Sequence, residues 1–291
     1  MSTEPSAING TFAFAWQNSG STVRAHRLID RSTPFDARFT LARPDLAAQA
    51  LEGIVRAETF RPVEPMRGAM PVADIHAEAS PTSERIDQLL HGEIFDVLDR
   101  RGGRVWGQSR RDGTVGWMEA AALVPHTGLP GRRVASVKAD LPLNALIDEN
   151  GLADRDMAPI GEFETDPIDV AERMLGVPHS LGARSSLSTD CSGLVQQALF
   201  ACGLAGPRHS DQQAQLGTEV SRAEARRGDI VVWLNPSSGQ SWTGHSALMT
   251  DPARVIHATG FHGVVAVEAF DEADARYRAD GFAAAVFRRL G

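Results

Sequence analysis

Apolar positions along this chain follow a helical spacing in two places and a strand-like spacing in most others. Residues 167–175 carry apolar side chains on one helical face after Asp166, a residue type that often caps helices. A second helix is predicted over residues 191–204. Helices followed by an antiparallel sheet are an α+β order, so residues 166–291 are predicted to form an α+β domain. The strand-like runs lie at residues 229–233, 245–250, 254–258, 264–267 and 282–288.

Residues 66–127 have a different texture, in which short apolar runs alternate with turns. Glycine marks the turns at residues 101–103 and 112–113. Five short strands in so small a segment predict an all-β barrel. The predicted strands lie at residues 72–75, 93–98, 105–108, 116–118 and 122–124.

The remaining segments, residues 1–65 and 128–165, are less regular. In the first, we expect an arm that docks through Phe12, Phe14 and Trp16, and then a short helix within residues 45–60 that leads into a strand. Residues 128–165 contain strand-like runs at 133–137 and 141–147 and a turn at 148–151. A linker and a degenerate second barrel both remain open for this segment.

The composition is that of an ordinary globular protein and excludes several classes of partner. The 291 residues are 42% hydrophobic and 23% charged, with a net charge of −8 and no basic face that would suit nucleic acid. No apolar run approaches the about 20 residues that a membrane helix needs, so no membrane insertion is expected. No signal peptide is evident, so we expect a cytoplasmic location. Non-classical export and delivery by a secretion or phage-like machine remain open, and the oligomeric state is not indicated.

The stretch Asp190-Cys191-Ser192-Gly193 lies where polar residues give way to the second helical pattern. A thiol at a helix start meets partial positive charge and unpaired N–H groups, which favour the thiolate. Most cysteines are buried and inert, but small and polar neighbours indicate that a substrate can approach this one. Cys202 lies in an apolar run and is expected to be a buried, inert thiol.

Two histidines follow in strand-like runs, His245 after a glycine and His257 in the next run. Alone, each would more often be structural. They flank a turn at residues 250–253, so they are expected on adjacent antiparallel strands. One imidazole could then take the proton of Cys191 while the other holds its tautomer and orientation. This order of groups is typical of a thiol hydrolase.

Metal binding is the competing use of cysteine and histidine. Zinc sites usually take two ligands from one short segment, and Cys191, Cys202 and His245 do not offer that spacing. His257 and His262 do, but a glycine lies between them and no second ligand pair is near. We therefore expect neither a metal nor another cofactor.

Five short motifs occur in order along the C-terminal part of the chain. They lie at residues 190–195, 207–213, 227–231, 244–247 and 256–258. Together they resemble the NlpC-type cysteine endopeptidases, papain-like enzymes that cut bacterial cell-wall peptides. The predicted barrel resembles a bacterial SH3-like domain, chiefly at residues 89–93, 112–113 and 116–117. This barrel is either a structural spacer or a wall that faces the substrate.

The resemblance implies a role for each matching residue. Cys191 is the nucleophile, its backbone N–H an oxyanion donor, His245 the general base and His257 the orienting group. Asp190 could meet a substrate amine. A helix cap with a solvated arginine is an equally good interpretation of Arg208 and Ser210. The family usually has a tyrosine where this chain has His179. The implied substrate-binding residues are His179, Asp190, Ser192, Arg208 and Ser210.

The reaction implied by the resemblance is hydrolysis of a murein-type peptide, most often between D-Glu and a diamino acid, through an acyl-thioester. An amidase or acyltransferase of the same fold is one alternative. A non-catalytic wall-binding or assembly module is another, although the complete Cys-His-His set argues against it.

Overall fold

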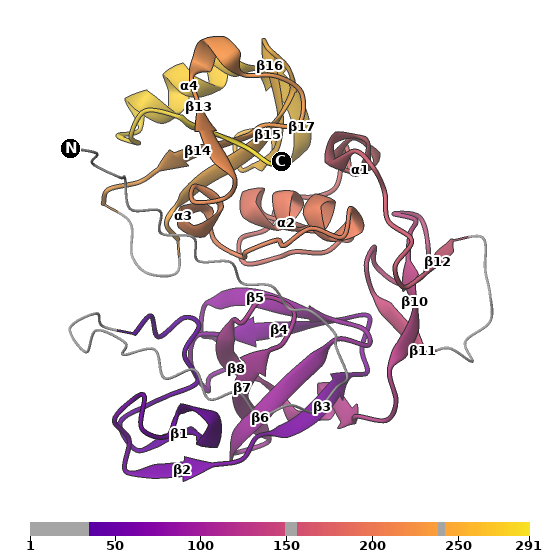
Figure 1. Cartoon of the computed structure of the whole chain (residues 1–291), viewed down its shortest axis with the longest axis vertical. Coiled ribbons are helices and arrows are strands. Elements are labelled where there is room, and N and C mark those ends of the chain that lie inside the picture. The colour runs from indigo at the N-terminus through magenta and orange to yellow at the C-terminus, as the bar shows by residue number, and fades with distance from the viewer. Residues whose placement is uncertain (1–34, 149–155, 238–241) are drawn as a thin grey trace, which may run out of the picture. The chain divides into compact units, whose positions relative to one another are not determined.

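The computed structural model describes residues 35–148, 156–237 and 242–291. The chain divides into two compact units, Met1–Phe35 and Asp36–Gly291. Every element described below lies in the second unit (Figure 1). The aromatic residues predicted to dock an N-terminal arm, Phe12, Phe14 and Trp16, lie outside the described residues.

An antiparallel sheet of seven strands, in the order β5-β4-β8-β7-β6-β3-β9, forms the SH3-like barrel. The five predicted strands correspond to β4, β6, β7, β8 and β9. Prediction missed β3, and it missed β5 because that strand buries Asp87 and Gln88 beside its leucines and so does not alternate. The strands are β3 (Glu64–Gly68), β4 (Val72–His76), β5 (Arg85–Leu90), β6 (Ile94–Arg101), β7 (Arg104–Ser109), β8 (Val115–Glu119) and β9 (Leu123–Pro125), with the 3₁₀ turn η2 (Ala120–Ala122) before the last.

The helix predicted within residues 45–60 is wrong. The structure has strand β1 (Leu46–Ala48), the 3₁₀ turn η1 (Gln49–Leu51) and strand β2 (Thr59–Arg61), which pairs in parallel with β1. All three residues of β1 are buried. Leu46 and Ala48 pack in a cluster with Trp106 of the barrel, and this tertiary contact outweighs the helical spacing.

A three-stranded antiparallel sheet of β10 (Pro130–Val134), β11 (Leu146–Asp148) and β12 (Met157–Pro159) follows the barrel. The predicted runs overlap β10 and β11 only at their ends. Leu143 lies in the core that surrounds helix α2 (Cys191–Ala201), so most of the second run is packed as a buried loop. The predicted turn extends beyond Asp148 into residues outside those described.

The C-terminal part has the predicted α+β architecture. Helix α1 (Pro167–Arg173) is capped by Asp166, which accepts from the backbone N–H of Ile168 at 2.8 Å. The sheet has six strands in the order β13-β18-β14-β15-β16-β17. Helices α3 and α4 were not predicted. The elements after α1 are α2 (Cys191–Ala201), α3 (Ser210–Gln213), β13 (Thr218–Val220), η3 (Arg222–Glu224), β14 (Ile230–Leu234), β15 (Gly244–Asp251), β16 (Arg254–Thr259), β17 (Val264–Ala269), α4 (Phe270–Ala279) and β18 (Val286–Arg289).

Helix α2 is buried along its whole length. On one side Leu194 and Leu199 pack in a cluster with Ile256 and other sheet residues. On the other side the amide of Gln196 donates to Asp112 of the barrel at 3.2 Å. Helix α2 is therefore held by both domains.

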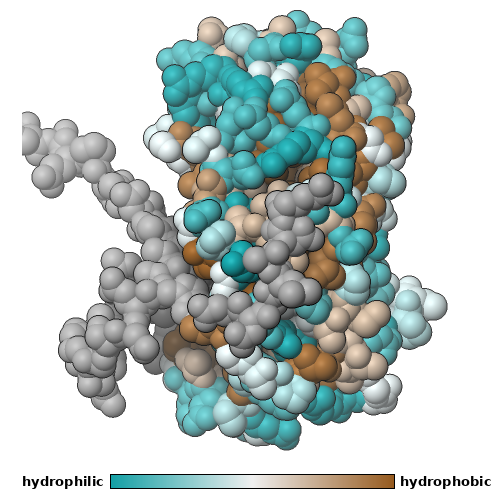
Figure 2. Space-filling model, turned by 90° about the vertical axis from the view of Figure 1, so that its right-hand side faces the viewer, coloured by the Kyte–Doolittle hydropathy of each residue, from teal (hydrophilic) through white to brown (hydrophobic). Residues whose placement is uncertain are grey.

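No helix in the described part of the chain is long and apolar enough to cross a bilayer. The face shown in Figure 2 mixes hydrophilic residues with smaller hydrophobic patches.

Candidate active site

Cys191 is the first residue of α2, and Asp190 caps that helix. The Asp190 carboxylate accepts from the backbone N–H groups of Gly193 at 2.7 Å and Gly182 at 2.9 Å. Burial, helped by the charge of Asp190, raises the pKa of the Cys191 thiol to about 11. The prediction that the helix start makes this thiol acidic is therefore wrong for the resting state, in which the sulfur keeps its proton and needs a base.

The thiol lies against strand β15, where it contacts the residues immediately before and after His245. Its Sγ is 4.0 Å from the carbonyl oxygen of Gly244, and the backbone N–H of Ser246 also hydrogen-bonds it. His245 is buried, and its Nε2 lies 2.8 Å from Nδ1 of His257 on β16. Because Nε2 is engaged in this way, Nδ1 is the nitrogen left for the thiol.

Both histidines are uncharged bases in the resting structure. Burial, followed by the neighbouring His257, holds the pKa of His245 well below its usual range. Burial also lowers the pKa of His257, although Glu268 opposes that effect. A neutral pair can accept one proton, so the arrangement can supply a base to the neighbouring thiol.

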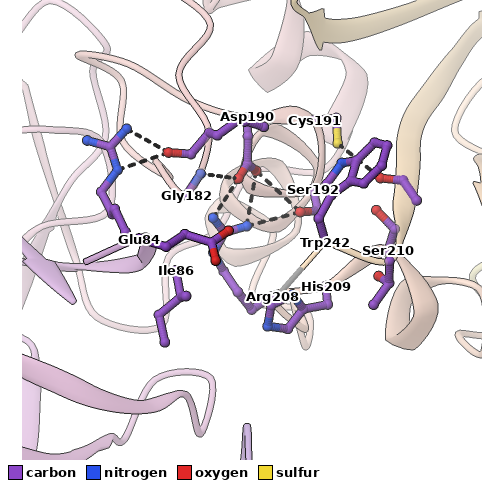
Figure 3. Close-up of a pocket in the computed structure, with 14 residues that line it drawn as sticks. Glu84, Ile86, Gly182, Asp190, Cys191, Ser192, Arg208, His209, Ser210 and Trp242 are labelled. Atoms are coloured by element: carbon purple, nitrogen blue, oxygen red, sulfur yellow. Dashed lines mark hydrogen bonds and ion pairs between the residues drawn. The ribbon is translucent and has the colours of Figure 1, made fainter. Parts of the chain in front are cut away.

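A pocket beside Cys191 is walled by both domains (Figure 3). Leu181 and Trp242 are exposed hydrophobic residues at its rim. The barrel contributes Glu84, Arg85 and Ile86, which favours the substrate-facing interpretation of the barrel over the spacer. The catalytic side contributes Leu181, Gly182, Asp190, Cys191, Ser192, Arg208, His209, Ser210, Trp242, Thr243 and Gly244.

Four of the implied substrate-binding residues line this pocket, but they are largely bound to one another. Arg208 is 2% exposed and donates to Asp190 at 2.6 and 3.0 Å, so it is not a solvated arginine and Asp190 is already neutralised. Ser192 Oγ accepts from Arg208 at 3.0 Å. Ser210 Oγ accepts from Ser246 Oγ at 3.0 Å. These contacts give the four residues a role in building the pocket wall.

His179 is not among the residues that line the pocket. It is half-buried, and its backbone N–H donates to the carbonyl of Gly263 at 2.8 Å. Burial lowers its pKa, and its field also lowers the pKa of His245. It therefore lies on the histidine side of the site.

No group of three or more His, Cys, Asp or Glu side chains that could hold a metal ion occurs within residues 35–148, 156–237 and 242–291. The two cysteines are free thiols, and Cys202 is half-buried.

Comparison with known proteins assigns the fold. Residues 176–282 match the model of the NlpC/P60 family. The C-terminal domain belongs to the NlpC/P60 family, a family of cysteine peptidases. Residues 75–123 match the bacterial dipeptidyl-peptidase Sh3 domain. An NlpC/P60 family protein from Bacillus cereus has the same fold, with a TM-score of 0.64 and 17% identity over 77% of this chain and 99% of that one.

Curated relatives are similar to about a third of this chain. Peptidoglycan endopeptidase RipB of Mycobacterium tuberculosis is 34% identical over 110 residues, which are 33% of this chain and 44% of the relative. Gamma-D-glutamyl-L-lysine dipeptidyl-peptidase of Bacillus cereus is 26% identical over 93 residues, 32% of this chain and 28% of the relative. The chain thus spans less than half the length of either relative.

Sequence reasoning missed two residues that contact the histidines of the NlpC/P60 domain. The ring of Tyr277 stacks on His245, with centroids 4.3 Å apart and planes 23° apart. Glu268 Oε1 lies 2.6 Å from His257 Nε2. Tyr277 is the chain's one tyrosine, which could have singled it out, but it lies on the unpredicted helix α4. Glu268 gave no signal beyond being an acidic residue at the end of an apolar run.

Proposed function

We propose that this protein is a cysteine endopeptidase that hydrolyses peptidoglycan-derived peptides between γ-D-glutamate and a diamino acid. One observation carries the proposal: Cys191 begins a capped, buried helix, against the strand whose His245 is held by His257. The NlpC/P60 membership of the domain and the names of its relatives support the substrate class.

The reaction follows from this geometry. His245 Nδ1 takes the proton of Cys191, and the sulfur attacks the scissile carbonyl. The backbone N–H of Cys191, at the start of α2, lacks a helical acceptor and donates to the developing oxyanion. The protonated His245 then gives its proton to the leaving amine, and water hydrolyses the thioester.

The barrel side of the pocket supports a small, positively charged substrate end. Glu84 is exposed there, and it makes no ion pair with the residues that the structure describes. A carboxylate that lines a pocket attracts an ammonium group. Short stem peptides with a free amino terminus therefore suit the pocket better than intact murein.

The test is digestion of an L-Ala-γ-D-Glu-diamino acid peptide, its amino-acetylated form and intact murein, with products read by mass spectrometry. We expect cleavage of the free peptide, slower cleavage of the blocked one, and background activity in Cys191→Ala. Cys202→Ala is the matched control and should cleave normally. Full activity in Cys191→Ala would refute the mechanism, and an amine-transfer product would favour the acyltransferase alternative. The cytoplasmic location stays a prediction for cell fractionation to test.

A further inference from the structure

The contacts of the catalytic histidines continue beyond His257 to a buried carboxylate. Strands β16 and β17 pair with His257 opposite Ala266, so Glu268 lies two residues further along the neighbouring strand and on the same face. Its Oε1 is 2.6 Å from His257 Nε2, an ion-pair contact in which the ring N–H direction is bent away from the oxygen. The Glu268 side chain is 7% exposed.

Arg276 of α4 fixes that carboxylate from the other side. Its guanidinium donates Nη1 to Oε2 at 3.0 Å and Nη2 to Oε1 at 2.5 Å. His262 Nε2 lies 3.6 Å from Oε2. Burial raises the pKa of Glu268, but His257 and Arg276 outweigh it and hold that pKa at about 2. The group next to His257 is therefore an anion at every working pH.

An anion at this position determines which nitrogens carry protons. A lone pair on His257 Nε2 would face a carboxylate oxygen at 2.6 Å, which is repulsive, so Nε2 carries the proton. Neutral His257 then has a lone pair on Nδ1, and His245 must donate its Nε2–H to it across 2.8 Å. His245 Nδ1 is left unprotonated, which is the form that can accept the thiol proton.

We propose that Glu268, held by Arg276, is a positioning residue that sets the tautomers of both histidines and stabilises the imidazolium formed when Cys191 loses its proton. The inference rests on the proposed peptidase mechanism. The proton passes from Cys191 Sγ to His245 Nδ1 and goes no further. His257 and Glu268 keep their protonation states throughout, so the carboxylate acts through its charge and its hydrogen-bonding requirement.

Glu268→Gln tests the proposal with little change in size. Both Glu268 oxygens face Arg276 donors, so an amide must turn its NH₂ toward either Arg276 or His257. The variant therefore weakens the anchor or reverses the His257 tautomer, and we expect kcat to fall about 10- to 100-fold. The charged and titratable groups that act on the two histidines are His179, His262, Glu268, Arg276 and, through its ring, Tyr277. Because only the anion is removed from this set, the acid limb of kcat/KM should move to lower pH.

Glu219→Gln is the matched control. Glu219 is an exposed carboxylate that contacts Arg288 at 3.3 Å from β13, the sheet edge opposite to β17. This variant should retain the wild-type kcat and pH profile. Thermal unfolding of both variants shows whether the fold is kept.

Two further measurements need no murein substrate. Alkylation of Cys191 at pH 7 should be about 10-fold slower in Glu268→Gln, because the thiolate–imidazolium pair loses its counter-charge. Nitrogen-15 NMR of the wild type should find His245 protonated at Nε2 and His257 at Nε2. If wild type cleaves no peptide, the proposed function fails, yet these measurements still decide the role of Glu268. The opposite tautomers, or a Glu268→Gln variant that matches Glu219→Gln in kcat, pH profile and alkylation, would overturn it.

Discussion

At the scale of single residues, the site depends on how His245 is held as well as on which residue it is. One edge of the imidazole contacts His257, and one face is covered by the ring of Tyr277. The hydroxyl of Tyr277 hydrogen-bonds Thr259 at 3.5 Å and also the side chain of Arg276, and neither contact is to His245. The ring of Tyr277 is therefore the part that restrains His245.

Replacing Tyr277 separates the ring from its hydroxyl. We expect Tyr277→Phe to retain activity within about twofold, because the stacked ring remains. Tyr277→Ala should lower kcat about 10-fold and reduce the free energy of unfolding by about 3–5 kcal/mol, since it empties a buried aromatic site. Steady-state kinetics and urea unfolding measure the two effects. Equal activity of the two variants would show that the stacking does not matter.

The sequence was sufficient for residues that motifs or periodicity identify and insufficient for those that only packing brings in. Cys191, His245 and His257 could be predicted because each stands at a recognisable point of a helix or strand. Glu268 and Tyr277 could not, since they reach the histidines across a hairpin and from a helix whose apolar pattern is weak. Gly193 was interpreted as leaving room for a substrate. In the structure an added Cβ would lie 2.5 Å from the carbonyl of Ala183, so this glycine permits close packing of the preceding loop.

At the scale of elements, the start of α2 is the critical junction. Asp190 accepts from two backbone N–H groups and from Arg208, so both of its oxygens act only as acceptors. An asparagine would turn an NH₂ group toward those donors. Helix α1 offers a comparison, because its cap Asp166 is 31% exposed and is paired with Arg227 at the surface.

We expect Asp190→Asn to reduce the free energy of unfolding by about 3–5 kcal/mol, because it leaves Arg208 partly unpaired in the interior. Asp166→Asn should cost less than about 1 kcal/mol, since asparagine caps helices as well as aspartate does. Urea unfolding at pH 7 measures both. Equal losses of unfolding free energy in the two variants would show that the buried ion pair of Asp190 with Arg208 adds no stability beyond that of a helix cap.

The loss of unfolding free energy in Asp190→Asn should depend on pH in a definite direction. Burial raises the pKa of Asp190, but Arg208 outweighs it, so the pKa lies below the ordinary aspartate range. A depressed carboxyl pKa stabilises the fold above the unfolded-state value, and that stabilisation is lost as pH falls through the folded-state value. The difference in unfolding free energy between Asp190→Asn and wild type should thus persist at about pH 5 and become smaller only in stronger acid. Narrowing already between pH 7 and 5 would contradict the assignment.

At the scale of the whole described unit, a buried ionic cluster joins the barrel to the NlpC/P60 domain. Arg184 is fully buried, donates to Asp87 at 3.0 Å and contacts Glu93 at 2.5 Å. Asp87 also accepts from Arg208 at 2.7 Å, so the barrel contacts Asp190, the cap of helix α2, through one arginine. The polar residues that are buried in β5 therefore make the contacts that hold the two domains together.

Two neighbouring acids of this cluster, Asp87 and Asp112, have pKa values shifted in opposite directions, which yields the final prediction. Burial and the neighbouring Asp112 raise the pKa of Asp87, and Asp112, to which Asp87 is hydrogen-bonded, has a lowered pKa. We predict that any proton shared by this pair lies on Asp87. Asp87→Asn should then change the free energy of unfolding by about 1 kcal/mol or less, measured by urea unfolding.

Glu93→Gln is the contrasting variant, because it removes the charge closest to Arg184 and should cost about 3–5 kcal/mol. Since Arg184 and Arg208 bind both domains, the loss of stability in Glu93→Gln should appear in both domains. Hydrogen exchange read by mass spectrometry should show faster exchange in β5 and in α2 together, with kcat reduced at temperatures near the new unfolding midpoint. Faster exchange confined to the barrel would mean that the two domains unfold independently and that the barrel acts on the active site only as a wall of the pocket.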